Sequence, residues 1–257
     1  MMAGVTPVES ISFSKVAAIY DETRGGAERG DRFGAALAPL CGPGPGPVLE
    51  IGVGTGIIAR PLQAELGRPV LGFDLAPEML AYAHERLGAR VGVADVAALP
   101  VRDGVASAVV ACWLIHLVGD PAAVLREVRR VLRPDGLLIV LSSRGELDPD
   151  DMDGAMVDLH DALRGRLDVR ERLEPLAAEC GLRLESEMLT GPGTWVESPD
   201  DLIERMERRQ WGVLIDLDQE RFDTIVQPVI DALRALPEPD RKRTRIGRHR
   251  MFVFTPA

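Results

Sequence analysis

The sequence predicts an α/β fold in which short buried strands and helices alternate around a doubly wound sheet. A short apolar run leads into a glycine-rich turn, and similar runs recur at intervals that leave room for a helix between them. Helix-start and turn signals separate the runs, such as Pro77 in the first turn after Asp74. The expected strands are residues 48–51, 69–74, 91–96, 105–112, 137–141, 182–189 and 251–254.

The first run continues into the segment Val48-Leu-Glu-Ile-Gly-Val-Gly-Thr-Gly56. Glycines at alternate positions let the backbone turn sharply and approach a ligand closely, because no Cβ stands in the way. A dinucleotide fingerprint needs its third glycine at position 57, which is Ile57 here. Glu50 disfavours a pyrophosphate and favours a ligand that carries an ammonium or sulfonium group.

Together these features resemble motif I of the class I S-adenosylmethionine (SAM) methyltransferases, and the later runs extend the resemblance over residues 13–142. The order of the runs is similar to that of the small-molecule group that includes the ubiquinone and menaquinone C-methyltransferases. The resemblance implies a Rossmann-like seven-stranded sheet with N-terminal helices and a helical lid insertion. It also implies SAM as the cofactor and a small molecule as the methyl acceptor.

The resemblance assigns cofactor contacts to the glycine loop, to the ends of the next two strands and to the leading helix. Asp74 is expected to bind the ribose hydroxyls, although an aspartate there could instead cap the following helix. Tyr20 and Arg24 are expected near the methionine carboxylate, with a surface ion pair as the alternative for Arg24. The full expected set is Tyr20, Arg24, Glu50, Gly52, Gly54, Thr55, Gly56, Asp74, Leu75, Met79, Asp95, Val96 and Cys112. Its apolar members could equally be core residues.

Fewer residues are candidates for acceptor binding and catalysis. His116 follows the fourth run and is expected at the carboxyl edge of the sheet, so it is the candidate general base. Against this, the family often has histidine there without proton transfer. Large aromatic surfaces that could hold an acceptor could also be core. The expected acceptor-binding set is Trp113, His116, His160, Trp195 and Trp211.

Composition narrows the class of protein. A chain of 257 residues that is 46% hydrophobic can bury the core of one α/β domain. Neither a membrane-spanning run nor a leader pattern is present, so we expect a cytoplasmic protein without a membrane partner. Cys41, Cys112 and Cys180 lack metal-ligand spacing and predict free thiols and no metal. The net charge of −10 argues against a nucleic-acid partner.

We expect a single methyltransferase domain over residues 1–257, and a homodimer is left open. Its parts are an N-terminal helical cap at 1–46, a sheet core at 47–192, a lid insertion at 193–240 and the last strand at 241–257. The basic run at 241–250 is interpreted as a solvated connection, with anion binding as the alternative. Loops and insertions on a fixed scaffold usually carry substrate choice, so the lid is expected to cover the acceptor.

The acceptor atom cannot be derived from these residues. O-methylation in secondary metabolism is the leading expectation, because it is the commonest outcome in the group that the sequence resembles. C-methylation of a quinone or polyketide ring is the alternative enzyme reaction. A SAM-binding protein that no longer transfers a methyl group is the alternative outside methyl transfer.

Overall fold

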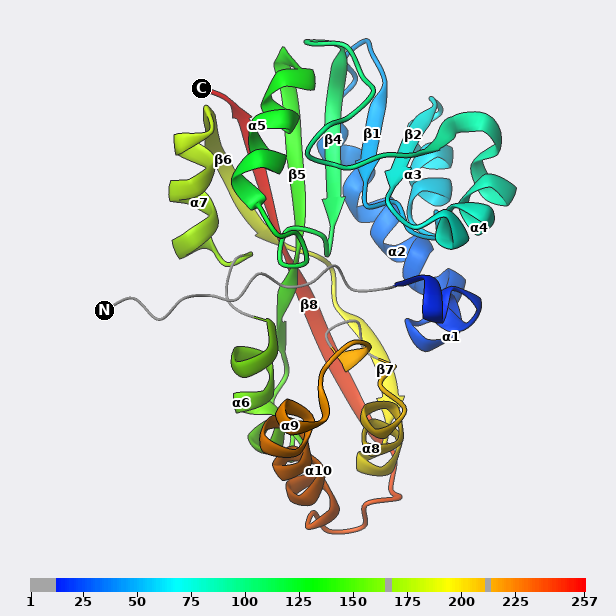
Figure 1. The fold of residues 1–257 in the computed structure, drawn as a ribbon, viewed down its shortest axis with the longest axis vertical. Coiled ribbons are helices and arrows are strands. Elements are labelled where there is room, and N and C mark those ends of the chain that lie inside the picture. Colours follow the sequence, from blue (N-terminus) through cyan, green and yellow to red (C-terminus); the bar gives the residue numbers. More distant parts are fainter. Residues whose placement is uncertain (1–12, 165–167, 211–213) are drawn as a thin grey trace.

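The computed structural model describes residues 13–164, 168–210 and 214–257 (Figure 1). One sheet in this part of the chain has eight strands, with the order β3-β2-β1-β4-β5-β8-β6 and with β7 paired to β8 beside that path. The first five strands in this order are parallel, whereas β8 is antiparallel to both of its neighbours. The strands are β1 (Val48–Ile51), β2 (Val70–Asp74), β3 (Val91–Val93), β4 (Ala106–Cys112), β5 (Leu132–Leu147), β6 (Leu182–Leu189), β7 (Gly193–Glu197) and β8 (Arg243–Pro256).

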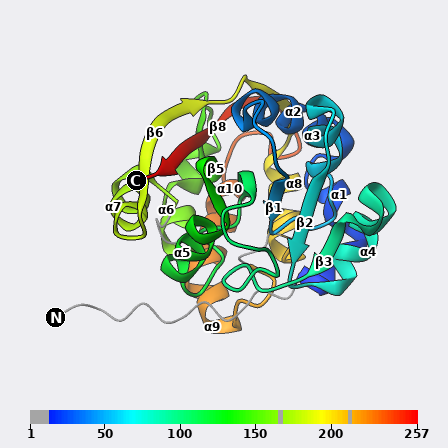
Figure 2. The same cartoon turned by 90° about the horizontal axis from the view of Figure 1, so that it is seen from above.

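Helices cover both faces of the sheet, as a doubly wound fold requires (Figure 2). One face packs against α2 (Gly26–Leu37), α3 (Ala59–Leu66) and α4 (Pro77–Leu87). The other face packs against α5 (Pro121–Val131) and α7 (Arg170–Glu179). The central strands β1 and β4 are buried along their whole length, which explains their continuous apolar sequence. The first described element of the N-terminal cap is a 3₁₀ helix at Phe13–Ile19, which is followed by α1 (Tyr20–Thr23).

The sheet differs from the expected seven strands by the additional strand β7. This strand lies in the segment expected to form the lid, and it pairs with β8 from Gly193 opposite Gly247 to Glu197 opposite Arg243. The last strand is also longer than the apolar run at 251–254 indicates, because its polar half pairs with β7 and with the end of β5. In this polar half of β8 the buried positions and the exposed positions both carry polar residues. An alternation of apolar and polar residues, which would predict a strand, is therefore absent from it.

A second lobe lies below the sheet core and has its own apolar core (Figure 1). It contains α6 (Asp153–Arg164), α8 (Pro199–Glu207), α9 (Gln219–Arg221), a π-helical turn at Phe222–Val226 and α10 (Gln227–Arg234). Ser198 caps α8 with a capping box that includes Asp201, as the sequence indicates. The lobe is thus built from α6 and the ends of β5 and β8 as well as from the inserted segment. None of the described helices is long and apolar enough to cross a bilayer.

The basic run near the end of the chain is part of β8, so the expectation of a solvated connection is wrong. Its arginines pair with acids at the end of β5 and at the start of α6. Arg243 pairs with Asp151 at 2.8 Å, and Arg248 pairs with Asp148 at 2.8 Å. Because these charges are neutralised within the protein, the anion-binding alternative has no support here either.

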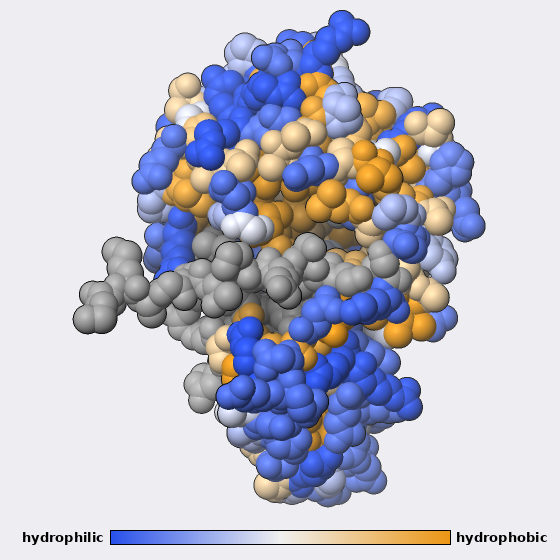
Figure 3. All heavy atoms as spheres, in the orientation of Figure 1, coloured by the Kyte–Doolittle hydropathy of each residue, from blue (hydrophilic) through white to orange (hydrophobic). Residues whose placement is uncertain are grey.

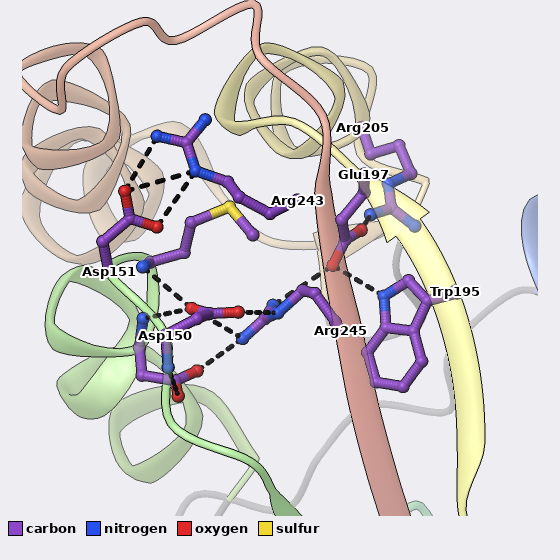
Figure 4. Close-up of polar contacts among 9 residues, drawn as sticks. Asp150, Asp151, Trp195, Glu197, Arg205, Arg243 and Arg245 are labelled. Atoms are coloured by element: carbon purple, nitrogen blue, oxygen red, sulfur yellow. Dashed lines mark hydrogen bonds and ion pairs between the residues drawn. The ribbon is translucent and has the colours of Figure 1, made fainter.

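Arg245 is the buried centre of this network (Figure 4). Its guanidinium lies 2.5 Å from Asp150 and 3.1 Å from Glu197, and it also contacts Asp153. Trp195 donates a hydrogen bond from Nε1 to Glu197 at 2.8 Å, and Arg205 pairs with the same carboxylate. The network therefore fastens the start of α6 and the strand β7 to β8.

Arg245→Leu should lower the free energy of unfolding by about 3 kcal/mol, because it removes the buried cation that Asp150, Asp153 and Glu197 share. Urea unfolding followed by circular dichroism measures this change. Arg248→Leu is the matched control on the same strand: its side chain is 33% exposed, against 5% for Arg245. The control should cost less than about 1 kcal/mol. Equal losses in the two variants would contradict the central role of Arg245.

Candidate cofactor and acceptor site

A cavity of about 580 Å³ lies where the carboxyl ends of β1, β2, β3 and β4 meet. This edge is where doubly wound sheets bind ligands, and the volume is within the range of small-molecule sites. Apolar residues gather on the sheet half of the face drawn in Figure 3, whereas the lower lobe is mostly hydrophilic there. Of the expected residues, the cavity is lined by Tyr20, Gly52, Gly54, Asp74, Leu75, Met79, Asp95, Val96, Cys112 and Trp113.

The glycine loop uses its glycines for two different purposes. Gly54 has a φ of +54° and lines the cavity, so a side chain there would enter the space available to a ligand. Gly56 has a φ of +73° and packs on α4, where a Cβ would lie 3.2 Å from the Cα of Ala83. Gly54 therefore shapes the cavity, and Gly56 allows α4 to approach the loop.

Asp74 holds the loop in place. Its Oδ2 accepts a hydrogen bond from the backbone N–H of Gly54 at 2.8 Å, and its Oδ1 accepts one from Ala76 at 2.9 Å. The residue that caps α4 is Ala76, so Asp74 is not the N-cap. Each carboxylate oxygen has a second acceptor position, and Asp74 lines the cavity. The arrangement leaves Asp74 able to accept hydrogen bonds from a ribose diol.

Apolar residues beside Asp74 differ in their burial. Leu75 is 58% exposed and lines the cavity, so it is not a core residue. Met79 and Val96 are buried and present one side to the cavity. Asp95 is exposed at the cavity, and one of its carboxylate oxygens accepts a hydrogen bond from the backbone N–H of Ala97 at 2.8 Å. These residues form an apolar wall with one carboxylate, which suits an adenine.

Glu50 is buried in β1 beneath the loop and does not line the cavity. Burial and, to a smaller extent, the neighbouring charge of Asp74 raise its pKa to about 8. Its Oε2 has no hydrogen-bond partner among the described residues. A cationic group bound nearby would stabilise the ionised carboxylate. Glu50 thus suits a ligand that carries an ammonium or sulfonium group.

The side chain of Thr55 joins the glycine loop to α1, and its expected contact with the cofactor stays a prediction. Its hydroxyl donates a hydrogen bond to Oδ1 of Asp21 at 2.6 Å. Arg86 donates to Oδ2 of Asp21 and to the carbonyl of Thr55, both at 2.6 Å. This clasp joins α1 to the glycine loop and to α4. Sequence analysis missed Asp21 and Arg86 because the three residues are far apart along the chain.

Tyr20 and Arg24 occupy different positions. Tyr20 lines the cavity, whereas Arg24 does not. The guanidinium of Arg24 lies 5.5 Å from the centre of the Tyr20 ring and donates a hydrogen bond to the carbonyl of Gln210 at 3.0 Å. No ion pair of Arg24 is found among the described residues, so the alternative of a surface ion pair has no support.

His116 lies away from the cavity and is buried. Its Nδ1 is 3.4 Å from Oδ2 of Asp168. Burial alone would raise the pKa of Asp168, but His116 and the backbone N–H of Ser143 hold it well below its usual range. Asp168 faces only Nδ1 of His116, and His116 is not among the residues that line the cavity, so its proton-transfer role stays a prediction.

The remaining acceptor candidates are not brought together. Trp113 lines the cavity, whereas Trp195 packs against Gly247 of β8. His160 lies on α6, but its side chain is outside the described residues, as is the whole of Trp211. No cluster of side chains that could hold a metal ion is found within the described ranges.

The part of the sheet core that contains the cavity matches a known protein family. Residues 49–140 match the family described as a methyltransferase domain. This segment contains the glycine loop, Asp74, Asp95 and the strand that ends at Cys112. The chain carries a class I SAM-dependent methyltransferase domain. Its cofactor is SAM, and the cavity, the positive-φ glycines and the unpaired oxygen of Glu50 fit that molecule.

Curated relatives share this domain but extend beyond it. A ubiquinone/menaquinone biosynthesis C-methyltransferase from Desulfotalea psychrophila is 36% identical over 140 residues, which are 51% of this chain and 56% of that protein. A demethylmenaquinone methyltransferase from Mycobacterium marinum is 36% identical over 132 residues, 50% of this chain and 56% of that one. A 23S rRNA guanine methyltransferase from Streptomyces fradiae is 32% identical over 193 residues, 68% of this chain and 63% of that one. The matches to the first two relatives span about half of their length.

Solved structures share the fold at low sequence identity. A methyltransferase from Bacillus halodurans aligns with a TM-score of 0.60 at 17% identity, over 87% of this chain and 99% of that one. A phosphoethanolamine N-methyltransferase from Haemonchus contortus aligns with a TM-score of 0.56 at 20% identity, over 98% of this chain and 60% of that one. A [4+2]-cyclase aligns over the full length of both chains with a TM-score of 0.61 at 18% identity.

Gly54→Val should abolish the binding of S-adenosylhomocysteine, because the new side chain would occupy the cavity. Calorimetry with S-adenosylhomocysteine measures the affinity. Gly67→Val is the matched control: Gly67 has a similar φ of +61° but faces open space at the end of α3. The control should lose stability through the same backbone strain and keep its affinity. If both variants lost binding equally, strain and not the occupied cavity would be the cause.

Glu50 should make cofactor binding depend on pH. With a pKa of about 8 it is mostly protonated at neutral pH, so a cationic cofactor that favours its ionised form expels a proton. Affinity for SAM should rise by up to about tenfold per pH unit towards the pKa and level off above it. Calorimetry in buffers of different ionisation enthalpy counts the released protons.

Glu50→Gln removes this titration, so its binding should release fewer protons and vary less with pH. Without ligand, the raised pKa of Glu50 means that its contribution to stability is lost as the pH rises through about 8. The melting temperature of the variant should therefore vary less with pH between about 4.5 and 8 than that of the wild type. An unchanged proton release in the variant would refute the assignment to Glu50.

Proposed function

We propose that this protein transfers a methyl group from SAM to a small organic acceptor in secondary metabolism, and that the acceptor atom is oxygen. The cavity carries this proposal, because Gly54, Asp74 and the aromatic Trp113 line one connected space. The space is continuous from the cofactor-binding loop to a large apolar surface. An acceptor can therefore lie next to a cofactor held by the loop.

The protein contributes binding, orientation and exclusion of water. Asp74 fixes the glycine loop and would accept the ribose hydroxyls, while Glu50 would balance the positive charge of the ligand. SAM supplies a methyl group that its sulfonium has already activated. Phe13 and Tyr20 of the N-terminal cap lie over the cavity, where they limit its contact with water. The main requirement of such a methyl transfer is that the acceptor atom is aligned with the methyl group of SAM and that water is excluded from both.

The choice of oxygen rests on the titratable groups of the cavity. Those among its described lining residues are Tyr20, Asp74, Asp95, Asp120 and Cys112. Burial raises the pKa of the Cys112 thiol well above its usual value, with a further rise from Glu50. A neutral buried thiol is a poor base, so an acceptor that arrives already ionised suits this site best. Carboxylates and acidic ring hydroxyls are such acceptors.

C-methylation of a quinone or polyketide ring is the alternative reaction, and the names of the quinone relatives support it. An ionised ring hydroxyl also activates its neighbouring carbon, so the same cavity would serve. A protein that binds SAM without transferring its methyl group is the second alternative, which the full-length likeness to a [4+2]-cyclase supports. One relative is named for ribosomal RNA, but the net charge of −10 opposes that class of acceptor.

The test is turnover of isotopically methyl-labelled SAM with fractionated extract of the source organism. We expect S-adenosylhomocysteine to form with a small-molecule fraction, and we expect mass analysis to find the label on an oxygen. Gly54→Val serves as the inactive control. Label on carbon would select the alternative reaction, and label in the ribosomal RNA fraction would overturn a small acceptor. Binding of SAM without turnover in any fraction would favour a protein that does not transfer the methyl group.

A further inference from the structure

Arg24, Arg29 and Arg32 form a row at the junction of the N-terminal helices, the end of β4 and the lower lobe. Arg29 donates a hydrogen bond from Nη1 to the carbonyl of Arg24 at 3.0 Å. Arg24 reaches the carbonyl of Gln210, which follows α8. The guanidinium of Arg32 lies over Gly193 at the start of β7, in the space that a Cβ would occupy there. We refer to these three residues as the arginine row.

The arginine row is not paired with acids in the part of the chain that the structure describes, although Glu28 acts on Arg32 from a greater distance. Within the described part of the chain, no carboxylate lies within ion-pair distance of any of its members. Burial lowers the pKa of Arg29 to about 10 and lowers the pKa values of Arg24 and Arg32 as well. The Nε atoms of Arg24 and Arg32 are buried without a hydrogen-bond partner. By contrast, the arginines of β8 are paired with acids.

The arginine row adjoins the cavity. The guanidinium of Arg29 lies 3.7 Å from the centre of the Trp113 ring, and Trp113 lines the cavity. The electrostatic neighbours of Arg29 include Tyr20 and Cys112, which line the cavity too. Three half-buried positive charges without an acid at ion-pair distance among the described residues are costly unless an anion binds them. Guanidinium groups bind carboxylates and phosphates through pairs of parallel hydrogen bonds, so an anion of either kind could bind to these arginines.

Resting on the proposed function, we propose that the acceptor is an anion whose carboxylate or phosphate group is bound by Arg29 and Arg32, with Arg24 close by. The methionine carboxylate of SAM is the other possible source of this charge. Two observations favour the acceptor. Three cations exceed what one carboxylate needs, and Arg24 and Arg32 contact Gln210 and Gly193 of the lower lobe, whereas the cofactor loop belongs to the sheet core.

The experiment is calorimetry with inorganic phosphate as the probe for the anion. Phosphate is titrated into the full chain with and without saturating S-adenosylhomocysteine, so the result does not depend on cofactor binding. Arg29→Gln and Arg32→Gln are compared with Arg102→Gln, which removes an exposed arginine in the turn before β4, at the opposite edge of the sheet. Arg29→Lys retains the positive charge, and melting curves show that each variant is folded.

We expect the wild type to bind phosphate, and we expect Arg29→Gln and Arg32→Gln to weaken that binding by about tenfold or more. Arg29→Lys should weaken it less, and Arg102→Gln should leave it unchanged. Affinity for S-adenosylhomocysteine should stay within about twofold in all of them, because its site is separate. Absence of phosphate binding by the wild type would overturn the proposal.

A second comparison separates the two sources of negative charge. 5′-Methylthioadenosine has the nucleoside and sulfur of the cofactor but not its amino-acid carboxylate. If Arg29→Gln and Arg32→Gln weakened S-adenosylhomocysteine but not methylthioadenosine, the arginine row would bind the cofactor and the proposal would be overturned. If neither cofactor fragment bound the wild type, the proposed function would fail while the phosphate result stood on its own.

Discussion

The hydrogen bonds that Asp74 accepts are the constraint on which the site depends. Parallel pairing of β1 with β2 places the glycine loop beside the end of β2, and Asp74 then binds the backbone N–H groups of Gly54 and Ala76. One carboxylate thus sets the shape of the loop and the start of α4. Because the loop, the helix and the acid all line the cavity, the surface offered to a cofactor is fixed before the cofactor binds, which reduces the entropy that binding costs.

Charge is distributed unevenly over the molecule. In the lower lobe, Arg245 is surrounded by acids and serves to hold elements together. Around the cavity, neither the buried Glu50 nor the arginine row has a partner of opposite charge at ion-pair distance among the described residues. Ionisable groups that lack partners away from water are costly for a folded protein, so their concentration at one place marks where ligands can supply the missing partner. The paired network and the unpaired groups therefore separate the part that supports the fold from the part that binds.

The elements that were predicted best from the sequence are those that depend on the pattern of neighbouring residues. The strands β1, β2 and β4, the glycine loop and Pro77 at the start of α4 follow from apolar runs and turn chemistry within a few residues. The misses are partners that meet only in the folded chain. The acids that neutralise the basic run lie roughly a hundred residues before it, and His116 meets Asp168 from a distant segment of the chain. No periodicity of a single segment contains such pairings, so the roles of His116 and Thr55 could not be derived from the sequence.

The strands β5 and β8 pass from the sheet core into the lower lobe as one antiparallel pair, interrupted only by a register shift between Leu141 and Gly145. A lobe built on a continuous sheet keeps a fixed position relative to the cavity, because moving it away would break the backbone hydrogen bonds between the two strands. The N-terminal cap, by contrast, is held over the cavity by short helical turns and by the Asp21 clasp. An element held by a few side-chain contacts opens more readily than one held by a backbone ladder.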